Sequence, residues 1–414
     1  MSQNRFLKNF SSLSLYQISE YLLPLITFPY LVRVLGPANY GLYQFAAGFI
    51  GYFLIVIDFG FYTTATRAVS LNKAESTKIS EIFWSVYIIK IFLFAICLTA
   101  FISITESITL LEENNFLLYI MFIGLFGNLL FPNWLFQGFE EMKFLPMITI
   151  PVRSIKIILI FLVITESNDL IFLALLNSSS MVIRGITGFV LGSIKYRIKF
   201  IIPDLPAIKK YFSDSLSHFN ILFFTNIKST SNTFILGLFV SYEVVGVFAA
   251  AEKLKFAFES LLKVFNDSLF PRISRKLLSQ QAIYLPPKKY LFASSAFIIA
   301  SLSAFFLLAE KLVPFLLGDN YYSAIILLYF LLPAAVFVAV NHFLVYVILV
   351  NINKQNAVIF AQLISAVFHL IVVSLFSSLF GGIGMSAGIL LSEVTFFIFL
   401  LILFHKSKHL IKIK

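Results

Sequence analysis

The sequence has few of the residues on which disulfide-linked and water-soluble proteins depend. Its 414 residues include a single cysteine, Cys97, which excludes a disulfide within the chain and a cysteine-based metal site. Charged residues make up only 12% of the chain, half of the roughly 25% that is usual in soluble domains. This shortage of charge excludes an ordinary water-soluble enzyme.

Motifs for nucleotide and metal chemistry are absent as well. The sequence contains no phosphate-binding glycine loop, no HExxH and no CxxC. A nucleotide-hydrolysing domain is therefore not expected, and no cofactor is predicted beyond coupling to H⁺ or Na⁺. Transport would then draw on such an ion gradient, on the substrate's own gradient or on a partner. His218, His342 and His369 lack ligand spacing, and we interpret them as buried polar residues.

Long apolar runs are what the sequence does contain. Hydrophobic residues make up 59% of it, including 50 Phe. Runs of about 20 apolar residues, long enough to cross a bilayer as a helix, recur from end to end. We therefore predict an all-α polytopic membrane protein. Its twelve expected spans are 13–33, 42–62, 83–104, 116–136, 146–164, 170–192, 216–240, 244–265, 291–313, 324–350, 357–379 and 385–404.

Basic residues in the connections predict the orientation of the chain. Lys and Arg concentrate on the side that holds both termini, as at Arg67, Lys143 and Lys195, whereas the opposite side has Lys311 and, at a helix end, Arg33. The positive-inside rule then places both termini in the cytoplasm. Because most basic residues stand between apolar runs, we attribute the net charge of +11 to topology and expect no nucleic-acid partner.

The two halves of the sequence resemble each other. An offset of 205 residues superposes Gly41 on Gly246, Ala46 on Ala251 and Phe53 on Phe258. We predict two six-helix lobes, residues 1–205 and 206–414, around a central cavity. Because six spans per half form a parallel repeat, which is a transporter architecture, the substrate site is expected between the halves.

Several basic residues fall inside the predicted spans, where each charge facing lipid costs about 2.5–3.5 kcal/mol. Arg153 and Lys156 are three residues apart and share a helix face. We predict that a cationic cavity gathers six of them as substrate-binding residues: Lys90, Arg153, Lys156, Arg184, Lys228 and Lys255. The alternative for Lys90 and Arg153 is that their side chains snorkel to the cytoplasmic headgroups.

Acidic residues inside the spans are fewer, and an intramembrane carboxylate is by default a functional candidate. Four are candidates for ion coupling, with a static salt bridge as the alternative for each: Glu20, Asp58, Glu259 and Glu393. Glu20 precedes Pro24 and Pro29, which permit a bend in the first span. Glu259 belongs to a ladder of alternating charge at i,i+4 spacing, which either lines the cavity or projects into cytoplasmic water. The ladder comprises Lys255, Glu259, Lys263 and Asp267.

The seventh predicted span is polar in its middle, over residues 225–233. We expect this segment to line water or a sugar-binding space, with helix packing accounting for some of its small hydroxyl residues. The glycine pairs Gly188/Gly192 and Gly384/Gly388 are interpreted as close helix contacts rather than binding loops.

Three motifs near the start of the chain resemble those of a known family. They are YLVRVLGPANYGLY over residues 30–43, DFGF over 58–61 and ATRAVS over 65–70. The pattern resembles the opening of the polysaccharide-transporter family, the Wzx-type O-antigen flippases. This family belongs to the multidrug/oligosaccharidyl-lipid/polysaccharide exporter superfamily, which also contains multidrug exporters and the lipid II flippase.

The resemblance implies a function and a location. The expected activity is that of a flippase, not an enzyme, which moves an undecaprenyl-diphosphate-linked oligosaccharide from the cytoplasmic to the periplasmic leaflet of the bacterial inner membrane by alternating access. The implied partners are this lipid-linked glycan and membrane lipids, with the polymerase and chain-length regulator of the same pathway as candidate protein partners. A diphosphate needs buried positive charge, which fits the predicted cationic cavity.

Alternative functions are a multidrug exporter or lipid II flippase of the same superfamily, and a membrane-embedded polysaccharide polymerase or ligase. A drug exporter would favour an acidic cavity, which the excess of intramembrane base argues against. A lipid II flippase usually has additional spans. A polymerase typically needs a large periplasmic loop with catalytic Arg or His, and the predicted loops on that side are short and nearly devoid of base.

Overall fold

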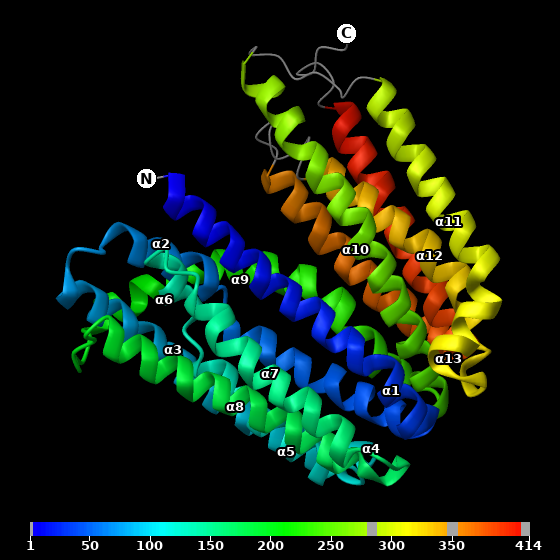
Figure 1. Ribbon diagram of the computed structural model, residues 1–414, viewed down its shortest axis with the longest axis horizontal. Helices are drawn as coiled ribbons and strands as arrows, with labels where there is room; N and C mark the ends of the chain where they lie inside the picture. Colours follow the sequence, from blue (N-terminus) through cyan, green and yellow to red (C-terminus); the bar gives the residue numbers. More distant parts are fainter. Residues whose placement is uncertain (1–2, 280–287, 346–354, 407–414) are drawn as a thin grey trace. The chain divides into compact units, whose positions relative to one another are not determined.

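The structure is a computed structural model that describes residues 3–279, 288–345 and 355–406 (Figure 1). These residues form α-helices and two short 3-10 turns, and they contain no strand. The helices are α1 (Gln3–Asp58), α2 (Phe61–Leu71), α3 (Ser76–Ser107), α4 (Thr109–Glu112), α5 (Asn115–Leu130), α6 (Asn133–Gly138), α7 (Phe144–Val163), α8 (Leu170–Lys195), α9 (Leu205–Gly237), α10 (Tyr242–Ser279), α11 (Lys288–Leu317), α12 (Ala324–His342) and α13 (Gln355–Lys406), with the turns η1 (Ser167–Asp169) and η2 (Asp319–Tyr321).

Two of these helices are broken at a glycine. The backbone leaves helical geometry at Gly36 in α1, with φ 69°, and at Gly381 in α13, with φ 57°. Both angles lie in the left-handed region, which glycine adopts without the steric cost of a Cβ atom. Each broken helix therefore holds two of the predicted spans. Every one of the twelve predicted spans corresponds to a helix or to one part of a broken helix, and the predicted all-α polytopic fold is confirmed, although the end of the span 324–350 lies outside the described residues.

The outer faces of the helices carry large apolar side chains that a water-soluble protein would bury. Ile155 and Leu162 on α7 are 59% and 70% exposed, and Ile183 on α8 is 53% exposed. Within the described part of the chain, eight helical segments are long and apolar enough to cross a membrane. α9 and α10 are not among them because their middles are polar or charged. Such exposed apolar faces are expected where helices contact lipid.

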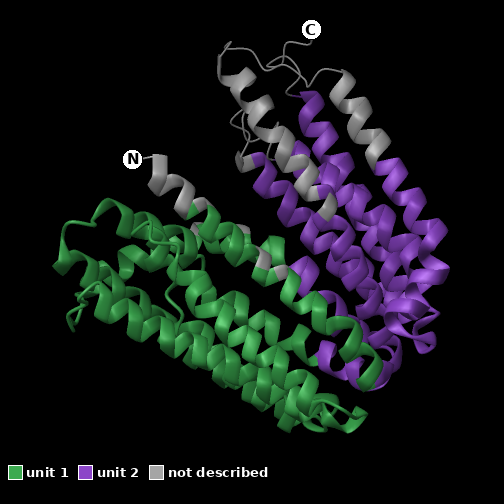
Figure 2. Ribbon diagram, in the orientation of Figure 1, with its two compact units in different colours: residues 1–35, 46–226 green, residues 36–45, 227–414 purple. Residues whose placement is uncertain are grey.

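The chain divides into two compact units (Figure 2). Unit 1 comprises residues 1–35 and 46–226, and unit 2 comprises residues 36–45 and 227–414. The segment 36–45, which begins at the break in α1, is thus separated in sequence from the rest of its unit. The division at residue 205 that the repeat suggested concerns sequence halves, and it stays a prediction.

The glycine pair that anchored the repeat forms a close helix contact inside unit 2. A Cβ atom at Gly41 would overlap the carbonyl of Tyr242, and one at Gly246 would overlap the carbonyl of Pro37. Gly41 and Gly246 thus contact each other's helices with their bare backbones.

Candidate functional site: a cationic cluster in unit 1

The packing of α5 against α8 builds the foundation of the site. A Cβ atom at Gly127 would overlap the backbone at Met181, and one at Gly185 would overlap the backbone of Gly127. The two helices therefore approach at backbone distance, as small residues allow in membrane proteins. Asn128 follows Gly127 and Arg184 precedes Gly185, so this close approach brings the amide within reach of the guanidinium.

Arg184 is held on this surface by two contacts. Its Nη2 donates a hydrogen bond to Asn128 Oδ1 at 2.8 Å, and its guanidinium lies 4.9 Å from the centre of the Phe131 ring. Gly188, one turn further along α8, leaves the room that Phe131 fills. Arg184 Nε is buried and has no hydrogen-bond partner in the described structure. One donor of this guanidinium thus remains available.

Lys90 joins the same surface from α3. Its side chain is only 3% exposed, and its Nζ lies 3.4 Å from the backbone oxygen of Asn128, to which it donates. This burial against α5 favours the predicted place of Lys90 in the cationic site over the alternative that it snorkels to the headgroups. The hydrogen-bond acceptor of this ammonium is neutral, and a buried charge is costly unless an anion lies near it.

α7 adds two further cations on one face. Arg153 Nη1 donates to the backbone oxygen of Ser19 at 3.1 Å, and Lys156 Nζ donates to Asn177 Oδ1 at 2.9 Å. Asn177 and Arg184 are seven residues apart on α8 and share its face, so α7 and α8 present their basic groups to each other. Arg153 thus contacts α1 inside the unit, and the alternative that it snorkels to the headgroups stays open.

Glu20 on α1 is the carboxylate that lies among these cations. Its Oε1 is 2.7 Å from Arg153 Nη2 and 3.8 Å from Arg184 Nη1. Tyr16, one turn earlier on α1, is hydrogen-bonded to Glu20. The side chain of Glu20 is 30% exposed, whereas those of Arg153 and Arg184 are 18% and 12% exposed. The Glu20 side chain is thus more exposed than the two arginines, although its Oε1 atom is buried.

Asp58, at the end of α1, is the second acidic group of this region. Its side chain is exposed, and its charge interacts with those of Lys90 and Arg184. In this region, four positively charged side chains lie near two negatively charged ones, which gives a formal net charge of +2. The four cations are Lys90, Arg153, Lys156 and Arg184, and the two anions are Glu20 and Asp58. We call these six side chains the cationic cluster.

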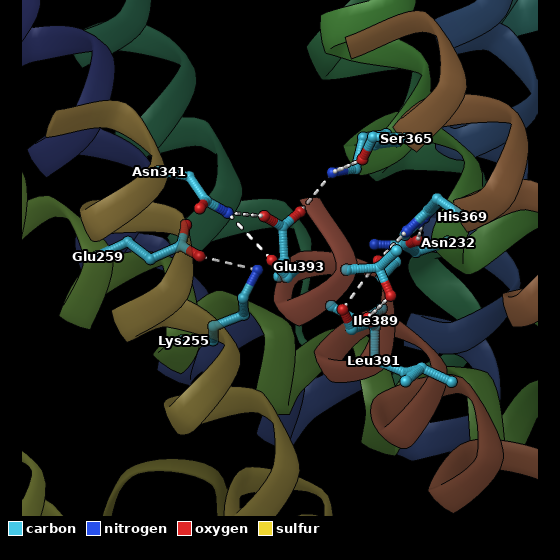
Figure 3. A network of polar contacts seen from close by, with 12 residues as sticks. Asn232, Lys255, Glu259, Asn341, Ser365, His369, Ile389, Leu391 and Glu393 are labelled. Carbon is cyan, nitrogen blue, oxygen red and sulfur yellow. Dashed lines mark hydrogen bonds and ion pairs between the residues drawn. The ribbon is translucent and has the colours of Figure 1, made fainter. Parts of the chain in front are cut away.

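The remaining predicted site residues belong to a separate network in unit 2 (Figure 3). Lys228 on α9 forms an ion pair of 2.5 Å with Glu393 on α13 and contacts Ser365 Oγ at 3.3 Å. Asn341 on α12 donates to Glu393 Oε2 at 3.0 Å. Glu393 is 8% exposed and Asn341 3%. Lys228 is therefore matched by a buried carboxylate.

His369 on α13 is linked through Asn232 on α9 to Glu252 on α10 by a chain of hydrogen bonds. Asn232 Nδ2 donates to Glu252 Oε1 at 2.6 Å, which turns the amide oxygen of Asn232 toward His369 Nε2 at 3.1 Å. Because that oxygen can only accept, Nε2 donates, and the hydroxyl of Ser392 lies 2.8 Å from Nδ1. His369 is 2% exposed, in agreement with its interpretation as a buried polar residue.

The charge ladder of α10 is paired within its own helix. Lys255 lies 2.8 Å from Glu259, and both side chains are largely buried. Lys253 is exposed and interacts with Glu252. The side chains of Lys263 and Asp267, which continue the ladder, lie outside the described residues. Among the described side chains of this network, three positive charges (Lys228, Lys253, Lys255) thus face three negative ones (Glu252, Glu259, Glu393).

The polar middle of α9 divides into two kinds of residue. Ser231, Asn232 and Thr233 are buried, and Thr233 donates to the backbone of Gln44 inside unit 2. Thr225 and Asn226 are exposed. The expected contribution of helix packing is confirmed for the buried residues, and the exposed ones keep their place as candidates for sugar contact.

Sequence reasoning missed the neutral partners of the charged groups. Asn128, Asn177 and Asn341 each fall in the middle of an apolar run, and each accepts from or donates to a charged group. An amide in the middle of an apolar span is costly without a partner, and this cost is the signal that would have found them. The glycine pairs Gly188/Gly192 and Gly384/Gly388 are close helix contacts, as predicted.

Long apolar helices that expose hydrophobic faces and bury ion-paired charges are typical of a polytopic membrane protein. Solved structures support the fold. The chain matches "Lipid II flippase MurJ, inward closed conformation" with a TM-score of 0.71 at 13% identity, covering 97% of this chain and 87% of that one. It also matches an inward-facing multidrug resistance MATE family transporter of the MOP superfamily with a TM-score of 0.65 at 14% identity, over 97% and 99% of the two chains.

Sequence comparison gives the family. Residues 6–277 match the polysaccharide biosynthesis protein family, and the chain belongs to it. A "Putative O-antigen transporter" of Escherichia coli (strain K12) is 29% identical over 93% of both chains. A protein of the same description from Shigella dysenteriae is 26% identical over 95% of this chain and 98% of that one. The family resemblance of the opening motifs is confirmed, and both of these relatives are named as transporters.

Proposed function

We propose that the protein is a flippase that moves an undecaprenyl-diphosphate-linked oligosaccharide, an O-antigen or similar repeat unit, to the periplasmic leaflet of the bacterial inner membrane. The observation that carries this proposal is the +2 excess of charge in the cationic cluster. A diphosphate that links a lipid to a sugar carries two negative charges, which would neutralise the cluster. Arginine is suited to such a ligand because its fork of N–H donors matches phosphate oxygens.

The other parts of the substrate fit other surfaces. The lipid tail would stay in the bilayer beside the apolar helix faces, and sugar hydroxyls would contact exposed polar residues of α9 such as Thr225 and Asn226. Translocation would follow alternating access, in which the two halves of a parallel repeat rock about the substrate. Both termini would lie in the cytoplasm, where the basic connections belong.

We also propose coupling to a gradient of H⁺ or Na⁺. The candidate carboxylates are Glu20 and Asp58 beside the cations of unit 1, and Glu259 and Glu393 in unit 2. If coupling runs through Glu20 or Asp58, their amide variants should lose the response of the flipping rate to one gradient. Normal flipping by both variants under every gradient would contradict this part of the proposal.

The test of the flippase is an assay of leaflet accessibility. In a polysaccharide-producing bacterium that lacks the gene, labelled lipid-linked oligosaccharide should accumulate intact on the cytoplasmic leaflet. The wild-type protein should clear it, and an Arg153→Ala/Arg184→Ala variant should not. Lys73→Ala is the matched control, because it also removes an ion-paired base of unit 1, at 2.6 Å from Glu140 and outside the cluster. Substrate that reaches the periplasmic leaflet without the protein would contradict the proposal.

A further inference from the structure

Glu20 stands where a ligand's phosphate would be expected to stand. One of its oxygens lies between two guanidinium groups, 2.7 Å from Arg153 and 3.8 Å from Arg184. An oxygen shared by two arginines is also the arrangement in which arginines hold a phosphate. A diphosphate that bound both arginines would therefore have to take the place of this carboxylate.

The other cations of the cluster are prepared for an anion but are held by neutral groups. Lys156 is bound to the amide oxygen of Asn177, and Lys90 to the backbone oxygen of Asn128. These contacts fix the side chains without neutralising them. The free Nε of Arg184 is one more donor that Glu20 leaves unused. The two arginines are thus preorganised around Glu20, and Asp58, whose charge interacts with those of Lys90 and Arg184, is the other carboxylate of the cluster.

Of the three side chains, Glu20 is the one that can move away from its partners. It is 30% exposed, against 18% and 12% for its two partners, so water can solvate its charge when a ligand takes the arginines. Tyr16 offers it a hydrogen bond on its own helix, at i−4. Arg153 and Arg184, in contrast, are fixed by the backbone oxygen of Ser19 and by Asn128.

We propose that Glu20 is a built-in competitor of the substrate: it occupies Arg153 and Arg184 in the empty protein, yields them to a phosphate group of the substrate, and reclaims them when the substrate leaves. This inference rests on the proposed function and adds to it. A flippase that binds its substrate too tightly cannot release it on the far leaflet. Binding energy that stabilises every state of the transport cycle equally does not speed turnover. Returning Glu20 to the arginines makes release favourable.

The test compares two synthetic probes, farnesyl-diphospho-N-acetylglucosamine, with two negative charges, and farnesyl-phospho-N-acetylglucosamine, with one. Dissociation constants are measured on the full-length protein in detergent. A carboxylate that must be displaced costs every ligand the same free energy, so Glu20→Gln should tighten both probes by the same factor, about tenfold. A carboxylate that only repels the ligand from nearby would cost the dianionic probe twice the free energy that it costs the monoanionic probe. In that case the affinity gain of the diphosphate probe in Glu20→Gln would be near the square of the gain of the monophosphate probe, and this result would overturn the proposal.

Turnover supplies an independent readout. In liposomes, Glu20→Gln should lower both the KM and the kcat for flipping the diphosphate probe, because binding is tighter and release is slower. Glu141→Gln is the matched control, since it removes a carboxylate of the same unit that lies 3.9 Å from Lys195 and outside the cluster. Equal thermal stability of the two variants would exclude misfolding as the cause, and Glu20→Asp, which keeps the charge, should bind the probes more weakly than Glu20→Gln.

The two proposals fail in different ways. If Arg153→Ala leaves the affinity for the diphosphate probe unchanged, the proposed substrate site is wrong. If Arg153→Ala abolishes binding while Glu20→Gln leaves both affinities unchanged or weaker, the site stands and the role of Glu20 is wrong.

Discussion

The two units bury charge in opposite ways. In unit 1, four cations face two carboxylates, and most of the contacts that hold the cations are neutral amides or backbone oxygens. In the described part of the unit 2 network, three cations face three carboxylates, and Lys228 and Lys255 each have a carboxylate within 2.8 Å. Neutral partners orient a cation but leave its charge available. The difference shows that a charge inside a membrane helix indicates a binding site only once its partners are known.

The largest expected effect is on ligand affinity in unit 1. Hydrogen bonds to charged groups contribute about 1.5–3 kcal/mol each, so Arg153→Ala with Arg184→Ala should weaken binding of a lipid-linked diphosphate about 100-fold or more. The measurement is a binding titration on the purified protein. A loss of the same size in Lys73→Ala would show that general positive charge, rather than the cluster, attracts the ligand.

The next largest expected effect is a difference in thermal stability between carboxylate variants of the two units. Removing one partner of a buried ion pair costs about 3–5 kcal/mol, so Glu393→Gln should lower the apparent unfolding temperature of the protein in detergent clearly. Glu20→Gln should lower it less, because Glu20 is 30% exposed and its arginines keep neutral acceptors.

The double variant Lys228→Met/Glu393→Gln should regain much of the stability lost in Glu393→Gln, since it leaves no unpaired charge in the network. If Glu393→Gln alone unfolds at the wild-type temperature, the network of unit 2 does not depend on its ion pair and the contrast between the units is wrong.

A substitution at an uncharged residue should also lower the affinity of the cationic cluster for its ligand, by disturbing the packing of α5 against α8. Gly185→Leu would force α8 away from the backbone of Gly127 and separate Arg184 from Asn128. We expect the affinity for the diphosphate probe to fall about tenfold, the loss of one hydrogen bond to a charged group. Gly192→Ala on the same helix meets only side chains, at 3.2 Å and beyond, and should bind normally. Unchanged binding by Gly185→Leu would show that α5 does not position Arg184.

The smallest expected effect concerns the Phe131 ring, which contacts the guanidinium of Arg184. A cation–π contact contributes about 0.5–2 kcal/mol, so Phe131→Leu should weaken binding of the probe by a few-fold, roughly threefold. Phe144 is a suitable comparison, because its ring lies 5.1 Å from Lys143, outside the cluster. A larger loss in Phe144→Leu than in Phe131→Leu would contradict the assignment.

The sequence was sufficient for the helices and for the charged residues inside them. Apolar runs of bilayer length predict the spans because a helix must satisfy its own backbone in lipid. The division of the six predicted cations between two networks could not be predicted. The pairing of Lys228 with Glu393 joins residues 165 positions apart, and periodicity along one helix says nothing about which face of another helix it meets.

The close contact between Gly41 and Gly246 has a consequence for synthesis. The segment 36–45 leaves the ribosome early, but the helix that it contacts is made 205 residues later. At about 5–20 residues per second, the segment waits roughly 10–40 s for its partner. During that interval, its bare glycine backbone must remain free of other neighbours in the crowded site of membrane insertion. The order of synthesis therefore requires that the segment 36–45 stays available for this contact until α10 has been made, and only then can unit 2 assemble.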